Sequence, residues 1–156
     1  MRRLPFLAAC LALPLASLRA ADVSFVRVWP QWQSADPFIR ISEFFTGREN
    51  PGERIILRTQ ADNRAGLYFL IRVKNPGPLV AGTRFAVSVI VPGHPDPKVF
   101  SFATDVPAGG KVYQLGLTGA DWPGRKIYPL AWQVELLGAD GRPLATQQSF
   151  LWSKPN

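Results

Sequence analysis

Alternating apolar and polar positions run through most of the 156-residue chain, in short stretches that Gly and Pro interrupt. In the clearest stretch, Leu67, Phe69, Ile71 and Val73 share one face, and the other face carries two basic residues. A period of two with one apolar face is typical of a strand whose second face meets solvent. The same pattern, with β-branched and aromatic residues, predicts further strands at 22–29, 54–60, 84–91, 98–104 and 111–117.

The most regular part of the chain is residues 127–152, which predict a long β-hairpin. Asp140-Gly141 is a turn signal, because Gly accepts a positive φ and Asp bonds readily to nearby backbone. A three-residue loop over 139–141 sorts most apolar side chains onto one face, whereas a four-residue loop would mix the faces. The resulting pairs are Gly138–Arg142, Leu136–Leu144, Val134–Thr146, Trp132–Gln148, Leu130–Phe150 and Tyr128–Trp152.

Residues 31–53 break this rhythm. Asp36-Pro37, followed by Phe38, Ile41 and Phe45 and closed by Gly47, has the spacing and the ends of a short capped helix. As a strand, the same segment would place Glu43 among its apolar side chains, so the helical spacing fits better.

Turns rich in Gly and Pro separate the predicted strands: Pro30 is expected to end the first strand, and 92–97 should be a rigid, exposed loop. Short strands joined in this way, without a long helical period, favour a sandwich over any α/β fold. We therefore predict an all-β fold: a single antiparallel β-sandwich of about seven to eight strands, with one short helix or irregular insertion near residues 36–47. A hydrophobic content of 47% suits one domain of this length.

The first twenty residues form a separate segment. Arg2-Arg3 precede an apolar run over 4–18, and Ala20 ends a small-residue site, which is the pattern of a signal peptide. The run is too short to be a typical membrane span. Cys10 follows a lipobox-like triplet but lies inside the apolar run, so lipidation is not expected. We predict a signal peptide at 1–20, a sandwich domain at 21–156, and export to the periplasm or exterior.

Removal of residues 1–20 would leave no cysteine and 15 basic against 11 acidic residues, a net charge of +4. Disulfides, thiolate nucleophiles and cysteine metal sites are then excluded from the domain. The basic residues are scattered, so nucleic-acid binding is not indicated, although contact with anionic envelope polymers is compatible with this charge. No membrane span is expected after removal of the signal.

The segment 67–152 resembles immunoglobulin-like and fibronectin type III-like domains. The likeness rests on the strand rhythm and on Tyr128-x-Leu130-x-Trp132-x-Val134, entered through Trp122-Pro123, which is similar to a tyrosine corner with a core tryptophan. The chain departs from these domains in its missing cysteine pair, in a one-residue offset at the corner and in the insertion at 31–53. The resemblance implies a β-sandwich and leaves the chemistry open.

Catalytic constellations lack their distinctive members. His94 is the only histidine, with Asp96 nearby, and a solvated loop histidine is favoured over a catalytic base. One histidine cannot supply a typical zinc site, and the carboxylates Glu43, Glu49, Glu53 and Asp121 show no spacing that marks a catalytic pair. Gly109-Gly110 and Gly116-x-x-Gly119 are interpreted as turn glycines rather than a phosphate loop. We expect a non-enzyme without metal or cofactor.

Five tryptophans are the remaining unusual feature. Trp29, Trp32 and Trp122 lie at predicted strand ends or in loops, near Arg48 and Arg125, and these residue types are enriched in binding hot spots. The alternative is that each indole plugs one end of the core. These five residues are the candidate site for a partner or glycan.

The sequence favours an exported, non-catalytic binding or structural module of the bacterial cell envelope that acts through protein–protein contacts. This hypothesis expects an apolar patch or open sheet edge beside the insertion. A carbohydrate-binding module using exposed tryptophans is the alternative, and a small hydrolase centred on His94 is a weaker one.

Overall fold

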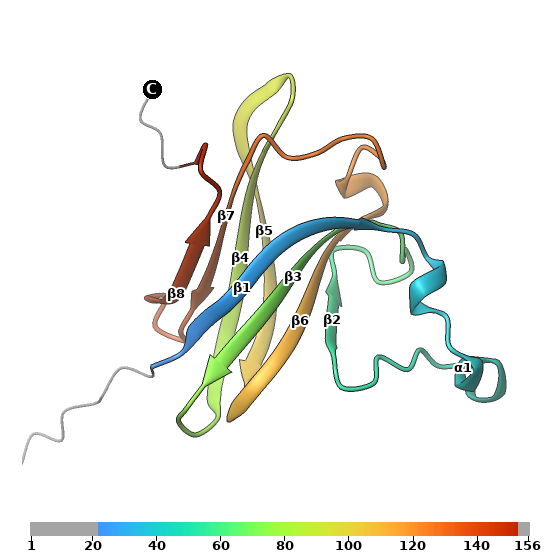
Figure 1. Cartoon of the computed structure of the whole chain (residues 1–156), viewed down its shortest axis with the longest axis horizontal. Coiled ribbons are helices and arrows are strands. Elements are labelled where there is room, and N and C mark those ends of the chain that lie inside the picture. Colours follow the sequence, from blue (N-terminus) through green and yellow to red (C-terminus); the bar gives the residue numbers. More distant parts are fainter. Residues whose placement is uncertain (1–21, 153–156) are drawn as a thin grey trace, which may run out of the picture.

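The computed structural model describes residues 22–152, so the predicted signal peptide and Cys10 lie outside the described part. The chain forms two four-stranded sheets (Figure 1). One sheet has the order β1-β3-β6-β2 and the other β5-β4-β7-β8. Their bounds are β1 (Ser24–Gln33), β2 (Ile55–Arg58), β3 (Gly66–Asn75), β4 (Val80–Val91), β5 (His94–Val106), β6 (Gly109–Thr118), β7 (Ala131–Leu137) and β8 (Pro143–Gln148). The predicted all-β sandwich with a short helix is confirmed.

The core lies between the sheets, where the inward positions of β3 are buried as the alternation predicts. Phe85 of β4 contacts Tyr113 of β6, with ring centroids 4.9 Å apart. Phe69 of β3 meets Trp132 of β7 edge to face at 5.7 Å. Aromatic rings from both sheets therefore join them across the layer.

β2 departs from the predicted antiparallel arrangement, because it pairs with β6 in parallel, from Ile55 opposite Tyr113 to Arg58 opposite Gly116. Just after β2, side-chain hydrogen bonds continue the contact between this segment and β6. Thr118 Oγ1 accepts a hydrogen bond from the Gln60 amide at 3.1 Å and donates one to the Gln60 carbonyl at 3.0 Å. These bonds fix the end of β2 against β6.

Two proline predictions were wrong. β1 continues past Pro30 to Gln33, and β5 begins at His94, so that the turn after β4 is only Pro92-Gly93. Both strands lie at the edge of a sheet, where the missing N–H of proline need not interrupt a ladder. Gly93 supplies the positive φ, 80°, that the short turn requires.

The loop of the last hairpin is as predicted, since the Gly138 amide donates to the Arg142 carbonyl at 2.9 Å. The predicted register beyond this loop is wrong by one residue. Leu137 pairs with Pro143 but Leu136 pairs with Ala145, so Leu144 is the extra residue of a bulge.

The hairpin is also shorter than predicted, because β7 begins only at Ala131. Tyr128 precedes the strand and is 63% exposed, which contradicts a tyrosine corner there. Phe150 follows β8 and is 74% exposed.

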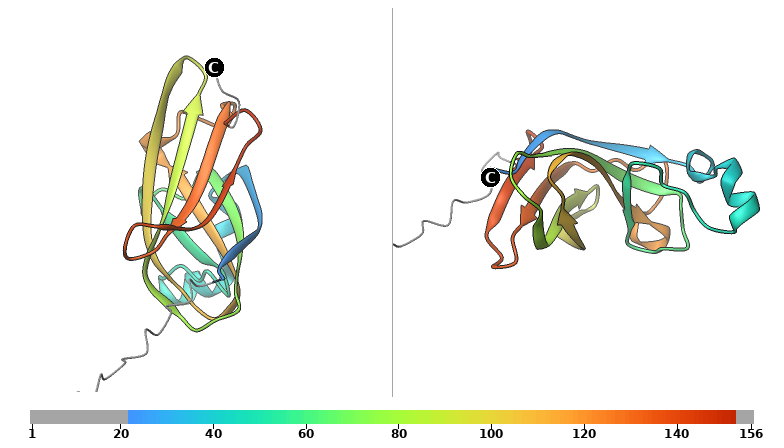
Figure 2. Two further views of the ribbon diagram at one scale, coloured as in Figure 1. Left: turned by 90° about the vertical axis from the view of Figure 1, so that its left-hand side faces the viewer. Right: turned by 90° about the horizontal axis from the view of Figure 1, so that it is seen from below.

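The insertion between β1 and β2 contains two helical turns, the 3₁₀ turn η1 (Asp36–Phe38) and the helix α1 (Ile41–Thr46). Gly47 ends α1 in the left-handed conformation, φ 65°, as the capped-helix pattern predicts. Figure 2 shows that this segment extends beyond the end of the sheets. A further 3₁₀ turn, η2 (Gly119–Asp121), follows β6. No helix within residues 22–152 has the length and hydropathy needed to cross a bilayer.

Candidate functional site

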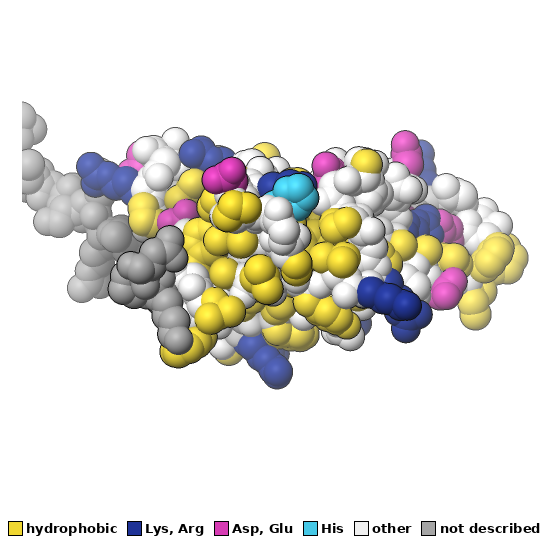
Figure 3. Space-filling view, turned by 90° about the horizontal axis from the view of Figure 1, so that it is seen from above, with side chains coloured by type: hydrophobic (Ala, Val, Ile, Leu, Met, Phe, Trp, Pro, Cys, Tyr) yellow, Lys and Arg dark blue, Asp and Glu magenta, His cyan; other side chains and the backbone are white. Residues whose placement is uncertain are grey.

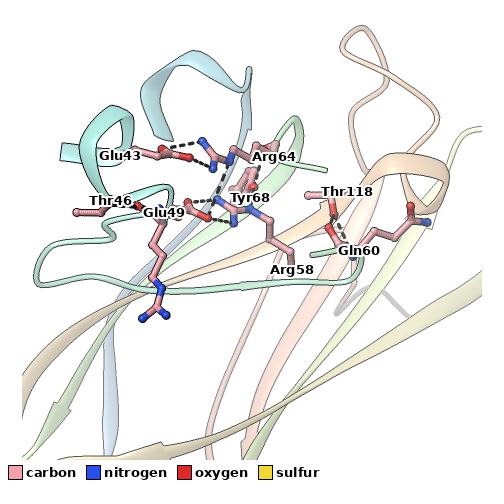
Figure 4. A network of polar contacts seen from close by, with 9 residues as sticks. Glu43, Thr46, Glu49, Arg58, Gln60, Arg64, Tyr68 and Thr118 are labelled. Carbon is pink, nitrogen blue, oxygen red and sulfur yellow. Dashed lines mark hydrogen bonds and ion pairs between the residues drawn. The ribbon is translucent and has the colours of Figure 1, made fainter. Parts of the chain in front are cut away.

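A network of polar side chains fastens the base of the insertion to the outer face of the β1-β3-β6-β2 sheet (Figure 4). Arg58 of β2 donates from both Nη atoms to the carboxylate of Glu49, at 2.7 and 2.6 Å. Its Nε donates to the hydroxyl of Tyr68 at 2.7 Å, and that hydroxyl donates to the Arg64 carbonyl at 2.6 Å. One guanidinium therefore links the insertion, β2 and β3.

A second ion pair joins Arg64 to Glu43 of α1. The hydrogen bond from Arg64 lowers the pKa of Glu43, and the one from Arg58 lowers the pKa of Glu49. Both carboxylates are thus held in their charged form. Burial raises the pKa of the Tyr68 phenol, which keeps it a proton donor.

An aromatic contact completes the base. Phe38 of η1 is 5% exposed and packs on Tyr68, with centroids 4.8 Å apart. The Arg58 guanidinium lies 4.7 Å from the centre of the Phe38 ring. The insertion is therefore packed at its base, although its tip projects.

The projecting part carries four exposed apolar side chains, which we call the insertion tip. They are Ile39 (46% exposed), Ile41 (78%), Phe44 (79%) and Phe45 (85%). Figure 3 shows hydrophobic side chains gathered at the end of the molecule where α1 lies. A hollow of about 390 Å³ beside them is lined by Ile39, Phe44, Gly47 and the Glu43–Arg64 pair.

A second surface brings together three of the five residues proposed from the sequence. Trp29, Trp32 and Arg125 line one open groove of about 600 Å³, together with Arg54, Gln31 and Gln114. Trp29 is half-buried, and the Arg27 guanidinium lies 4.5 Å from the centre of its ring. Trp32 is also half-buried and packs partly against the core. We call this surface the indole groove.

Gln114 is the most buried polar residue of the indole groove, at 2% exposure. Its Oε1 atom accepts no hydrogen bond from any described residue. A buried acceptor without a donor is unfavourable by about 1–3 kcal/mol, so rotation of the Gln114 amide to meet a ligand donor in the groove would be stabilising.

The other two proposed residues lie elsewhere. Trp122 is 4% exposed and belongs to the core, the alternative that the sequence left open, so it offers no ring to a ligand. Arg48 is exposed just after α1 and borders the insertion tip rather than the tryptophans.

His94 is exposed at the start of β5, beside a hollow of about 200 Å³ that Asp121 also lines. Among the described residues, no hydrogen bond joins the His94 ring to a serine or a carboxylate, so the arrangement that a hydrolase would use is not formed there. Within the same residues, no group of three or more His, Cys, Asp or Glu side chains could hold a metal ion.

Sequence reasoning missed several groups at these surfaces. The sequence predicts one short helix from Phe38, Ile41 and Phe45. In the structure Phe38 lies in η1 and is buried, whereas Ile41 and Phe45 of α1 face solvent. Gln114 and Arg54 come to the indole groove only through the pairing of β6 with β3 and β2. Their positions depend on strand order, which one sequence does not encode locally.

No protein-family model matches the chain, and no curated protein shows significant similarity to its sequence.

Proposed function

We propose that this protein is a non-catalytic binding module that docks a protein partner through the insertion tip. The observation that supports this most directly is the exposure of four large apolar side chains on one projecting segment. Single exposed apolar residues are common on soluble proteins, but a contiguous group usually marks an interaction site. The patch lies on the insertion, where the binding hypothesis expects it.

The insertion is firmly attached at its base, which favours a role in docking over that of a mobile loop. The Arg58 side chain is 6% exposed and forms a bidentate ion pair with Glu49, and Phe38 is buried at the base. A preorganised apolar surface binds with less loss of conformational entropy than a mobile one. The tip is therefore suited to fit a formed pocket.

The insertion tip combines apolar side chains with charged ones, which favours a protein over a bilayer as the partner. Ile41, Phe44 and Phe45 have the i, i+3, i+4 spacing by which a helix presents one face to a groove. The Glu43–Arg64 pair lies directly beside them, and insertion of such a pair into hydrocarbon is costly. An apolar centre with a polar rim is the usual anatomy of a protein interface.

Arg40 and Arg48 flank the tip, and neither forms an ion pair with any residue in the range 22–152. The negative charges of Glu43 and Glu49, in contrast, are balanced by Arg64 and Arg58. The rim is therefore positively charged, and we infer a partner with an apolar pocket edged by carboxylates.

The signal-like pattern of residues 1–20 supports export, so the partner would be a protein of the bacterial envelope or exterior. We further infer that the sandwich is immunoglobulin-like. In support, β1-β3-β6 and β8-β7-β4 have the order of the A-B-E and G-F-C strands of that fold. The edge next to β6, where strand D belongs, is occupied by β2 from the insertion.

A photo-crosslinking residue at position 45 would identify the partner, and binding would then be measured with both proteins purified. We expect Phe44→Ser with Phe45→Ser to weaken binding at least about tenfold, as for exposed aromatic hot spots. The matched control is Tyr128→Ser, another exposed aromatic residue outside the insertion. All three side chains are exposed, so the variants should keep their stability.

The proposal fails if the purified partner binds the double variant as tightly as the unchanged protein. It also fails if the tip instead mediates binding to anionic lipid vesicles, or concentration-dependent self-association, that the same two substitutions abolish.

A further inference from the structure

The outer face of the β1-β3-β6-β2 sheet carries a second, independent feature. The registers place Trp29, Leu70 and Gln114 in one row across β1, β3 and β6, and all three line the indole groove. The next row contains Arg27, Arg72 and Val112. An aromatic and amide row thus lies beside a basic one.

The basic row opens into a neighbouring groove of about 540 Å³. Arg40, Arg54, Arg72 and Lys111 line it, with Glu53 as its one acidic side chain, and we call it the basic groove. Arg54 and Val112 line both grooves, so the two hollows meet at these residues. Together they form a continuous surface that crosses the sheet.

The charge of this surface is strongly one-sided. The indole groove contributes Arg54 and Arg125 and has no acidic side chain in its lining. No cation of either groove forms an ion pair with another described residue. Clustered, unpaired guanidinium groups are suited to bind carboxylates or phosphates.

The rest of the indole groove is suited to a sugar ring. The half-buried Trp29 presents an apolar indole, which Arg27 holds by a cation–π contact at 4.5 Å. Gln31 supplies an amide for hydroxyl groups, and the buried Oε1 of Gln114, which has no donor, could accept one from a sugar if its amide rotated toward the groove. Nucleic acid fits less well, because its binding typically uses a series of exposed stacking rings.

We propose that this face binds an acidic polysaccharide, with a sugar ring in the indole groove and anionic groups along the basic groove. The ligand is a linear chain, because two adjoining grooves offer more than one binding position. The basic groove shares Arg40 with the rim of the insertion tip, but none of the four apolar side chains of the tip lines either groove, so the two proposals are tested separately.

Calorimetric titration of the purified protein tests the proposal with defined probes. The carboxylate probe is oligogalacturonate, the phosphate probe is a phosphomannan oligosaccharide, and the neutral probe is maltohexaose. We expect at least one acidic probe to bind about tenfold or more tightly than the neutral one, and its affinity to fall as salt is added. The two acidic arms distinguish carboxylate from phosphate as the recognised group.

Trp29→Ala and Arg54→Gln should each weaken binding of the acidic probe about tenfold, the effect typical of a central Trp or Arg contact. Arg142→Gln is the control for charge, because Arg142 is 86% exposed in the β7–β8 turn of the other sheet. Phe44→Ser with Phe45→Ser should leave glycan binding unchanged, and circular dichroism would verify that each variant is folded.

The proposal is overturned if neither acidic probe binds or if the neutral probe binds equally well. It is also overturned if single-stranded oligodeoxythymidine matches the acidic glycans, or if Arg142→Gln weakens binding as much as Arg54→Gln does.

Discussion

Arg58 and Glu49 meet through two parallel hydrogen bonds of 2.7 and 2.6 Å, with 6% and 24% of their side chains exposed. The pair joins the four-residue edge strand β2 to the irregular chain beyond α1. A short edge strand has few ladder bonds of its own, so this contact is a main cause of the fixed position of the insertion.

Replacement of Glu49 by Gln should destabilise the fold. The substitution leaves the guanidinium of Arg58 almost fully buried without a charged partner, which we expect to cost about 2–3 kcal/mol. Urea unfolding followed by circular dichroism measures the change. Glu53→Gln is the control, because Glu53 is exposed and has no ion pair among the described residues. Equal effects of the two substitutions would contradict the role given to Glu49.

Gly116 is required by close packing rather than by a turn. A Cβ atom there would lie 2.6 Å from Cε1 of Tyr68, whose ring lies against β6 near its C-terminal end. We expect Gly116→Ala to displace Tyr68 and to destabilise the fold by about 1–3 kcal/mol. Gly110→Ala in the same strand is the matched control, since its Cβ would have 4.0 Å to the nearest atom. A Gly116→Ala protein as stable as the Gly110→Ala protein would refute this packing argument.

The sandwich could be predicted from the sequence because its signals are local. Alternation along 67–74 and 111–117 identified the strands of the core, and the turn Asp140-Gly141 identified the last hairpin. The same reasoning interpreted Gly116 as a turn residue, since a glycine in mid-strand carries no local sign of the ring above it.

The predictions that were wrong depend on contacts between strands rather than on local sequence. Whether Pro30 ends a strand depends on whether that strand is an edge, and the register after Gly138 depends on a bulge at Leu144. The parallel pairing of β2 brings Arg58 beside Tyr68, which no short-range pattern indicates. Three of the five proposed site residues nevertheless meet in the indole groove, because Trp29 and Trp32 lie on the same strand, β1, and Arg125 reaches the same hollow.

Replacement of Asn75 should destabilise the fold, even when the new residue is Asp. It is fully buried, and its Nδ2 atom donates to the carbonyls of Pro78, Val106 and Pro107 at 2.8 to 3.2 Å, which ties two turns together. A carboxylate would oppose three carbonyl oxygens, so Asn75→Asp should cost about 3 kcal/mol or more near neutral pH.

Thermal unfolding measures the effect of Asn75→Asp against Asn50→Asp. At the exposed Asn50 the bond accepted from the Gly52 amide survives the substitution, so its stability should hardly change. Similar melting temperatures for the two variants would show that the donor function of Asn75 is dispensable.

Acid should loosen the insertion through Glu43 and Glu49. Hydrogen bonds from Arg64 and Arg58 lower the pKa of these two carboxyls below the ordinary value of 4.5. Because the folded state holds these protons less tightly than the unfolded chain, the stabilisation is complete above about pH 4.5 and is lost as pH falls through the lowered values. The free energy of unfolding should therefore decline with acid over that range.

Other carboxylates also titrate there, so the informative quantity is the difference between variants. Urea unfolding from about pH 7 to about pH 3 should give a shallower decline for Glu49→Gln than for the unchanged protein, since that variant has already lost the titrating group. Glu53→Gln should retain the steeper decline. Added salt should reduce the contribution of the more exposed Glu43–Arg64 pair, because ions screen charges near the surface. Parallel pH profiles for all three proteins would show that the Arg58–Glu49 pair does not couple protonation to folding.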